Sequence, residues 1–452
     1  MCSIIADPSS HTHYLAPILR VHAWRLLLLP TNPRNPSCTV LYKVIADHLE
    51  TFLASCEADP DATGLPAYVQ REFSDYSQCG ILAHGFLQLG CDTCHKELLL
   101  PFSCKRRGFC PSCAGRRMAQ TAAHLVECVI PWVPTRQWVV SVPMPLRYWM
   151  SSSQALTTKI HTIIRTTIAQ YYVKQAVKRG VARQQVQPGS VTFIQRFGGA
   201  LNLHVYFHCV FLEDVYLNRT ETGLKPRFVK GEPPSDAAVT AVLLKINRRV
   251  IPTLRRRGYL EAGSDAALAT GYDSLLDSEP ELARTRAASV TQRIAFGERT
   301  GQHVRRIGLG FGYEGESPAL TGPHCASVNG FSLHANTQVR AHRRDQLERL
   351  LRYTVRGAVA LERLAEDAHG DLMYTFTKPW SDGTTGITLS PLELLQKLAA
   401  LVPCRASNWY TMRGVWRRIV SFGTRSFRHR ANRGWPERRR SLVPLPGTRP
   451  SS

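Results

Sequence analysis

The chain has 452 residues, 44% of them hydrophobic and 20% charged, a composition that excludes a disordered or fibrous protein and allows two or three folded domains. Its 57 Lys and Arg against 34 Asp and Glu give a net charge of +23, which favours nucleic acid as partner; a generic basic protein is the alternative. The apolar run LLLL at 26–29 is too short to cross a bilayer and no targeting segment is evident, so we expect no membrane insertion.

The amino-terminal part of the chain divides into an extension and a helix. Residues 1–36 mix Pro, Asn and His without a sustained period and are expected to lie outside the fold, poorly ordered. From Thr39 to Ala54, apolar residues recur at helical spacing. This pattern predicts a helix that leads into a cysteine-rich segment.

Six of the 13 cysteines lie within 35 positions, a density typical of a metal site in a reducing compartment and not of a secreted disulfide framework. Cys91-x2-Cys94 and Cys110-x2-Cys113 are separated by fifteen residues. Two such pairs have the spacing of a tetrahedral zinc site. We predict a structural Zn²⁺ bound by Cys91, Cys94, Cys110 and Cys113, in preference to unbound buried cysteines.

Other residues of the same segment leave alternatives open. Cys79 and Cys104 could replace members of the predicted set, and His95 directly follows Cys94. Basic side chains bracket the second cysteine pair; they are Arg106, Arg107, Arg116 and Arg117. The zinc would then fix a basic surface against DNA phosphates. The alternative is that these arginines only solvate the outside of the module.

Three segments in the middle of the chain read as strands. Residues 137–143 and 191–197 have strand patterns, and the second is joined through Gly198-Gly199-Ala200 to a third strand at 201–212, which predicts a hairpin. Residues 153–183 between the first two are basic and helical in pattern.

The strand at 201–212 carries apolar residues on one face and His204, Tyr206 and His208 on the other. The first face belongs to a core and the second is a candidate site. The two histidines are four positions apart, roughly 13 Å along a strand, so they cannot bind one ion together without a bend or bulge.

The remaining segments contain further helices and strands. Residues 236–260 are helical in pattern, 262–303 read as a connector or insertion, 327–339 alternate like a strand, and a helix is predicted from about 344 to 367. The last segment, 404–452, has twelve Arg, no Lys and one acidic residue.

In the helix predicted from 344, Tyr353 lies off the apolar stripe, on the polar face with Arg349 and Arg356. Arginines four positions before and three after a tyrosine can bind a phosphate and stabilise a phenolate. A surface tyrosine without a catalytic role is the alternative.

Several long segments occur together in this chain, in the order CGILAHGF, SCKRRGFCPSCAGRRM, FIQRFGGALNLHVYFHCVFL, NGFSLHAN, RYTVRG with ALERL, and KPWSDGTTGITLSPLELLQKLAALVP. Over residues 38–403 the chain therefore resembles the rolling-circle transposases of bacterial insertion sequences, which are HUH (His-hydrophobic-His) endonucleases with an amino-terminal zinc module. The resemblance implies an α+β protein with a zinc-binding, DNA-contacting domain at 37–130. It further implies, at 131–403, a catalytic domain with an HUH-type antiparallel sheet flanked by helices.

The resemblance also implies an activity, which is nicking and rejoining of single-stranded DNA at element ends. In this family the histidine strand holds a divalent cation, so His204 and His208 would bind Mg²⁺ or Mn²⁺. Tyr353 matches the nucleophile that forms a 5′-phosphotyrosine, and Arg349 stands where the double-tyrosine branch has its other tyrosine. Arg349 and Arg356 would contact DNA. The expected location is the bacterial cytoplasm, associated with the nucleoid when bound to DNA.

Two departures from the family pattern keep other functions open. Tyr206 stands where the relatives have the middle histidine of His-x-His-x-His, which suggests a degenerate copy that binds DNA without cutting it. A zinc-dependent DNA-binding regulator is a third reading. Residues 404–452 differ from the family's continuation, and either a shifted reading frame near Cys404 or a basic tail that grips nucleic acid through Arg and Trp would account for them.

Overall fold

The structure is a computed structural model. It describes residues 2–5, 36–58, 62–91, 95, 97–217, 226–260, 273–308, 322–403 and 410–414. None of the helices in these ranges has both the length and the apolar character needed to cross a membrane.

The largest sheet is built around the predicted hairpin of β5 (Val186–Phe197) and β6 (Leu203–Leu217). The strand order is β15-β5-β6-β4-β10-β9, and all its pairings are antiparallel. The other strands are β4 (Thr135–Ser141), β9 (Cys325–Val328), β10 (Phe331–His334) and β15 (Tyr410–Gly414), with β11 (Gln338–Val339) on β4 and β7 (Arg227–Lys230) on β6. The predicted strands at 137–143, 191–197 and 201–212 are thus confirmed.

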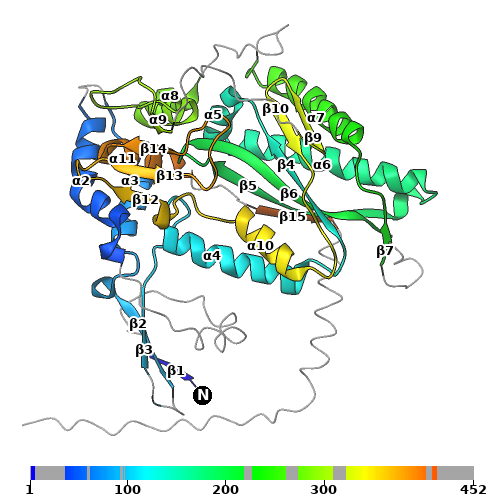
Figure 1. The fold of residues 1–452 in the computed structure, drawn as a ribbon, viewed down its shortest axis with the longest axis horizontal. Coiled ribbons are helices and arrows are strands. Elements are labelled where there is room, and N and C mark those ends of the chain that lie inside the picture. Colours follow the sequence, from blue (N-terminus) through cyan, green and yellow to red (C-terminus); the bar gives the residue numbers. More distant parts are fainter. Residues whose placement is uncertain are drawn as a thin grey trace, which may run out of the picture.

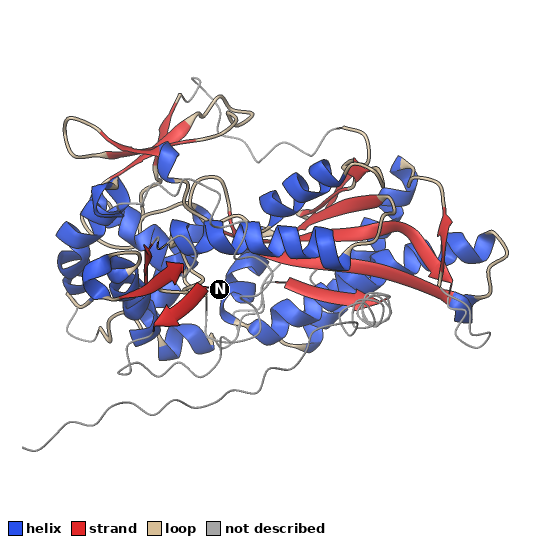
Figure 2. Ribbon diagram, turned by 90° about the horizontal axis from the view of Figure 1, so that it is seen from below, coloured by secondary structure: helices blue, strands red, loops and turns tan. Residues whose placement is uncertain are grey.

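Helices cover both faces of this sheet (Figures 1 and 2). On one face, α6 (Gln154–Lys178) and α7 (Asp236–Arg256) pack against Val205, Phe207 and Cys209 of β6. On the other face, α4 (Pro111–His124) continues into a π-helical turn, η3 (Leu125–Val129), and lies beside α10 (Arg344–Thr354). The α6–α7 core therefore uses the apolar side of β6, as the alternation predicted, and leaves its polar side facing α10.

Helix α10 is shorter than predicted, because it ends at Thr354 and not near residue 367. The amide of Val355 closes the last turn on the carbonyls of Leu351 and Arg352. The β-branched Val355 and then Gly357 have low helix propensity. At Gly357 the chain passes so close to α4 that an added Cβ would lie 2.6 Å from Ala114.

The cysteine-rich segment contains two helices and a hairpin. The helices are α2 (Val40–Cys56), capped by Thr39, and α3 (Ala67–Gln78). The hairpin consists of β2 (Phe86–Cys91) and β3 (Glu97–Pro101), and β1 (Cys2–Ile5) pairs with β2.

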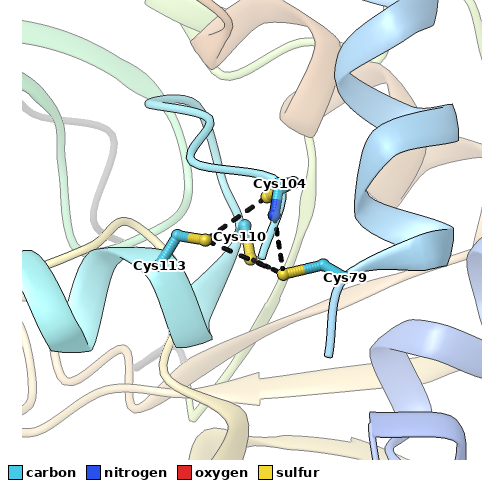
Figure 3. Close-up of side chains that lie close together, drawn as sticks. All are labelled: Cys79, Cys104, Cys110 and Cys113. Carbon is cyan, nitrogen blue, oxygen red and sulfur yellow. Dashed lines mark hydrogen bonds between the residues drawn. The ribbon is translucent and has the colours of Figure 1, made fainter. Parts of the chain in front are cut away.

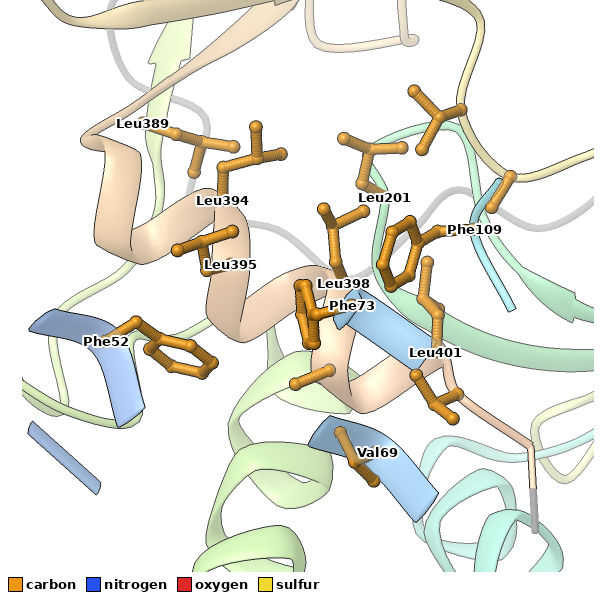
Figure 4. Packing of buried hydrophobic residues seen from close by; sticks show 14 of the residues in the cluster. Phe52, Val69, Phe73, Phe109, Leu201, Leu389, Leu394, Leu395, Leu398 and Leu401 are labelled. Carbon is orange, nitrogen blue, oxygen red and sulfur yellow. The ribbon is translucent and has the colours of Figure 1, made fainter. Parts of the chain in front are cut away.

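A single hydrophobic core joins this segment to the carboxy-terminal part of the described chain (Figure 4). Phe52 of α2 and Phe73 of α3 pack in the same cluster as Leu394 and Leu398 of α11 (Pro391–Leu401). The predicted connector at 262–303 contributes α9 (Pro280–Thr291), whose Leu282 is fully buried there. A small sheet closes this end of the molecule, with the strand order β12 (Leu364–Glu366), β13 (Leu372–Thr375), β14 (Gly386–Leu389) and β8 (Arg305–Ile307).

The remaining elements are α5 (Met144–Ser152), α8 (Ser274–Ser278), and the short 3-10 turns η1 (Pro36–Cys38), η2 (Leu82–His84), η4 (Arg183–Gln185) and η6 (Leu361–Arg363).

Candidate active site and metal centre

Four cysteine sulfurs converge between α3, β3 and α4 (Figure 3). Cys79 follows α3, Cys104 follows β3, and Cys110 and Cys113 stand at the start of α4. The Sγ atoms of Cys79 and Cys113 are 3.7 Å apart, those of Cys104 and Cys113 3.4 Å, and those of Cys79 and Cys110 3.7 Å. Tetrahedral zinc with bonds of about 2.3 Å separates its sulfurs by about 3.8 Å. The four cysteines therefore fit one Zn²⁺.

The four sulfurs are close enough to shift one another's pKa. Hydrogen bonds from neighbouring thiols, that of Cys104 first, lower the pKa of Cys113 and bring the pKa of Cys79 to about 7. Hydrogen bonds within the cluster, that of Cys104 first, raise the pKa of Cys110, and the pKa of Cys104 is also raised. Cys79 and Cys113 are therefore the members that form thiolates, the zinc-binding form, most readily. Cys113 in addition lies in the first turn of α4, where the positive end of the helix dipole stabilises an anion.

The observed group shares Cys110 and Cys113 with the predicted ligand set. It contains Cys79 and Cys104, the residues that the sequence allowed as replacements. Cys94 lies outside the described residues, and of Cys91 only the backbone in β2 is described. A role in zinc binding for Cys91 and Cys94 stays a prediction.

The loop before α4 is fixed by contacts with α3. Phe109 packs against Phe73, with ring centroids 4.8 Å apart, and the amide of Gly108 donates to the buried Glu72 carboxylate at 2.6 Å. An added Cβ at Gly108 would also lie 2.6 Å from that carboxylate, so only glycine fits.

Of the predicted DNA-contacting arginines near this loop, Arg107 and Arg116 are exposed. Arg106 pairs with Asp75, and Arg117 donates to the carbonyl of Arg106 at 2.7 Å. Arg106 and Arg117 thus also hold the loop in place, and DNA contact by the four arginines stays a prediction.

On the polar face of β6, Tyr206 separates the two histidines. Its ring centroid lies 5.0 Å from that of His204 and 5.0 Å from that of His208. The Tyr206 hydroxyl accepts a hydrogen bond from the amide of Gln195, and burial raises its pKa to about 12. At neutral pH the residue between the imidazoles is therefore an uncharged phenol.

Both ring nitrogens of His208 are engaged by glutamine amides. Nδ1 lies 2.9 Å from Nε2 of Gln137, and Nε2 lies 3.2 Å from Oε1 of Gln195. Because an amide nitrogen donates and an amide oxygen accepts, this arrangement assigns the ring proton to Nε2. The two glutamines were missed from the sequence, although both lie within predicted strands and a buried amide in an apolar strand is a recognisable signal.

Both histidines are uncharged at neutral pH. Burial lowers the pKa of His204 and of His208 to about 3, and the nearby charges of Arg147 and Arg356, respectively, add to the effect. The Nε2 atom of His204 is buried without a hydrogen-bond partner among the described residues.

As arranged, these side chains do not fit the divalent cation expected between His204 and His208. An ion bound to His208 would have to displace an amide of Gln137 or Gln195, and the interposed phenol is a poor ligand for Mg²⁺. Within the described ranges, the cysteine cluster is the only grouping of three or more His, Cys, Asp or Glu that could hold a metal.

Tyr353, at the end of α10, meets the histidine strand. Its ring lies edge-on to His208, with centroids 5.9 Å apart and planes at 81°, while half of the residue stays exposed. The Arg356 guanidinium lies 4.6 Å from the centroid of the Tyr353 ring. The structure therefore brings together Tyr353, His208 and Arg356, three of the predicted site residues.

Arg349 is not part of this group. It is 70% exposed at its side chain and forms an ion pair with Asp345 at 2.6 Å, one turn earlier on α10. Of the two arginines predicted to flank the tyrosine, Arg356 alone lies against its ring.

Two protein-family models match this sequence. Residues 44–142 match a family described as "Transposase zinc-binding domain", and residues 189–420 match one described as "Putative transposase". The second match covers more than half of the 452 residues, and it includes β15. No curated protein and no solved structure matched.

Proposed function

The chain belongs to the IS91-type rolling-circle transposases with an N-terminal zinc-binding domain, and from this premise we propose that it nicks and rejoins single-stranded DNA through Tyr353. Its partner is DNA, and its four clustered cysteines bind a structural Zn²⁺. We further infer that the large antiparallel sheet is of the HUH type and that single-stranded element ends are the substrate.

The proposed reaction is a transesterification that needs no co-reactant. The Tyr353 oxygen attacks the scissile phosphorus, the bond from phosphorus to the 3′ oxygen breaks, and a 5′-phosphotyrosine forms. The proton lost by the phenol is balanced by the proton gained by the leaving 3′-hydroxyl. Attack by another 3′-hydroxyl reverses the step and rejoins the strand, because the phosphodiester energy is conserved in the covalent intermediate.

The observation that carries this proposal is the position of Tyr353 between the exposed surface and the Arg356 guanidinium. Exposure gives DNA access to the hydroxyl. A fixed positive charge beside the phenol stabilises a phenolate and the charge that develops on a phosphate in the transition state. Arg356 Nε is buried without a hydrogen-bond partner in the described chain, and the Arg356 side chain also forms a hydrogen bond with Tyr206, which ties the guanidinium to the histidine strand.

The divalent cation expected at His204 and His208 stays a prediction that the arrangement of these side chains does not favour. Titration of Mg²⁺ or Mn²⁺ into protein that has been freed of both ions but retains its zinc, with covalent adduct formation as the readout, measures whether the reaction depends on either ion.

The test of the proposed function is capture of the covalent intermediate. The protein is incubated with labelled single-stranded DNA carrying the element ends, with Mg²⁺ or Mn²⁺, and run on a denaturing gel. We expect a DNA-linked band that disappears in Tyr353→Phe and persists in the matched control Tyr259→Phe, at the far side of the sheet near Trp149. An adduct that persists in Tyr353→Phe would refute the assigned nucleophile.

A DNA-binding copy without nicking activity is the second candidate, and a specific observation favours it. Tyr206 occupies the middle position of the histidine strand, and its partner Gln195 also binds His208. If this substitution has silenced the site, wild-type protein will bind DNA without forming an adduct, and Tyr206→His will restore adduct formation. A zinc-dependent regulator would gain no such activity from the same substitution.

A further inference from the structure

A cleft of about 570 Å³ opens between the start of α4 and the loop that follows α10. Its lining includes Cys79 and Cys110 of the zinc centre. Phe197 and Arg356 also line it, and the Arg356 guanidinium lies 5.7 Å from the Phe197 ring centroid and 4.6 Å from that of Tyr353. The cleft is thus lined both by cysteines of the metal centre and by an arginine that lies against the ring of the proposed nucleophile.

The walls of the cleft are mostly small or apolar. Met118 of α4 and Ala358 and Val359 of the loop supply apolar surface, and glycines on opposite sides keep the cleft open. Gly115 belongs to α4, and Gly199 to the turn between β5 and β6. At both glycines an added Cβ would meet no atom within 4 Å, so the space in front of them is free.

The charged groups of the lining lie along the loop after α10. Arg356 and Arg363 bring two positive charges, and Glu362 brings one negative charge. The Arg356 Nε atom has no hydrogen-bond partner in the described chain. A ligand with an anionic group beside Arg356 and an apolar, flat body would satisfy both parts of the cleft.

We propose that this cleft binds one unpaired deoxynucleotide of the DNA strand, the one that adjoins the scissile phosphate. Arg356 would bind its phosphate, and the apolar walls would contact its base. Because one of these walls is α4, the zinc-binding segment would form one side of the nucleotide site. The volume lies within the range of roughly 300 to 1,000 Å³ that is usual for small-ligand sites. Taking a base out of the stack also fixes the backbone at the position where the strand is cut.

This inference rests on Tyr353 as nucleophile for the position of the nucleotide, but binding can be measured without cleavage. The probes are a labelled oligothymidylate and an abasic sugar–phosphate polymer of the same length, and affinity is followed by fluorescence anisotropy. All measurements are made in full-length protein that also carries Tyr353→Phe. The difference between the two probes reports the contribution of bases alone.

The decisive variants fill the cleft from its two walls, Gly115→Leu from α4 and Gly199→Leu from the turn. We expect each to weaken oligothymidylate binding on the order of tenfold, the size of a lost base contact, and to leave the abasic polymer unaffected. The matched control is Gly90→Leu in β2, where an added Cβ also meets no atom within 4 Å but which lies outside the cleft. It should bind both probes like the parent protein.

Two variants at independent positions are used because one of them could fail to fold. Thermal unfolding identifies a variant that does not fold, and binding by the other variant then tests the nucleotide site. If both folded variants keep the parent preference for oligothymidylate, the nucleotide site is refuted. The phosphotyrosine step of the proposed function is tested separately, by adduct formation. A wild-type chain that forms no adduct while the cleft variants lose base binding would refute the phosphotyrosine step and support the nucleotide site.

Discussion

His208 shows how strongly single residues decide the chemistry of this site. Its two ring nitrogens are bound by Gln137 and Gln195, its ring contacts Tyr353, and Tyr206 stands between it and His204. These contacts orient the imidazole, and burial keeps it neutral. In this arrangement His208 lies against the ring of Tyr353, the proposed nucleophile, and does not offer a lone pair to an ion.

The buried histidines make stability depend on acidity. The folded pKa of about 3 lies below the unfolded value of 6.5, so the unfolded state gains protons first and stability falls as pH drops from 6.5 toward 3. Each histidine contributes at most about 2 kcal/mol of loss between pH 6.5 and 5.

We expect His204→Asn to reduce this pH dependence, measured by urea unfolding at pH 7 and pH 5. The zinc site is common to both proteins, so their difference isolates the histidine. Equal pH dependence in the variant and the parent would show that His204 is not held neutral.

Arg356 and Arg349 offer a matched comparison within one helix and its following loop. Arg356→Gln should slow adduct formation on the order of 100-fold, because it removes the charge next to the phenol and the phosphate. Arg356→Lys should recover part of the rate. Arg349→Gln, in an exposed ion pair with Asp345, should change it by no more than a few fold.

These rates are measured at saturating DNA, with affinity determined separately, so that a binding defect is distinguished from a chemical one. An equal loss in the Arg349 and Arg356 variants would contradict the assignment of Arg356 to the reacting phosphate.

At the scale of elements, β4 and β6 are locked together by a buried ion pair. Arg136 of β4 and Glu213 of β6 are both almost fully buried, and Arg136 also donates to the carbonyl of Ala335 at 2.7 Å. Gln338 of β11 donates to the same Glu213 carboxylate. The pair therefore fixes the register of the strands that carry Gln137 and His208.

Breaking this pair should be costly. We expect Arg136→Met to lower the free energy of unfolding by about 3 to 5 kcal/mol, because Glu213 would stay buried without a counter-charge. The control is Arg305→Met, whose ion pair with Asp371 is half exposed and should contribute less than about 1 kcal/mol. Chemical denaturation of both variants measures the difference, and equal effects would refute the role of burial.

Helix α11 contains a cation whose burial destabilises the fold. Lys397 is 3% exposed, its Nζ has no hydrogen-bond partner among the described residues, and burial lowers its pKa to about 8. Since 10.5 is the unfolded value, protonation at neutral pH disfavours the folded state by up to about 3 kcal/mol.

Lys397→Met should therefore raise the melting temperature at pH 7. The difference in melting temperature between the variant and the parent should shrink as pH rises from 8 to 10.5, because the lysine then loses its proton in both the folded and the unfolded state. Calorimetry across this range checks the prediction. A variant less stable than the parent at pH 7 would show that the ammonium has a partner that stabilises it.

Elements with a clear local period could be predicted from the sequence, whereas contacts between distant segments could not. The alternation of β6, the β5–β6 hairpin and the start of α10 follow from residue spacing. The end of α10 was wrong, because its apolar stripe continues past Val355 while the backbone turns toward α4. The amides that bind His208 depend on strand register between Gln137, Gln195 and β6, which spacing alone does not provide.

At the scale of the whole molecule, the zinc-binding segment and the large sheet are parts of one packed body. The cluster that contains Phe52 and Phe73 also contains Leu203 of β6 and Leu398 of α11. Residues of both predicted domains, 37–130 and 131–403, therefore contribute to one hydrophobic core. Loss of the metal should therefore destabilise this whole core and not only α4.

We expect one zinc ion per chain by elemental analysis, and its removal by a chelator should lower the melting temperature on the order of 10 °C. Cys113→Ser should reproduce the effect, because Cys113 contacts two of the other three sulfurs. Unfolding should remain a single transition. A separate early transition, with the sheet intact, would show that the zinc-binding segment folds independently.

The packing of α2 against α11 has a consequence for the order of events during synthesis. Residues 40–56 leave the ribosome long before 391–401, and at roughly 5 to 20 residues per second the gap between them is on the order of half a minute. Throughout that interval Phe52 and Phe73 lack the leucines that cover them in the finished fold. A nascent chain thus has an uncovered apolar surface until α11 is made, a surface of the kind that chaperones bind.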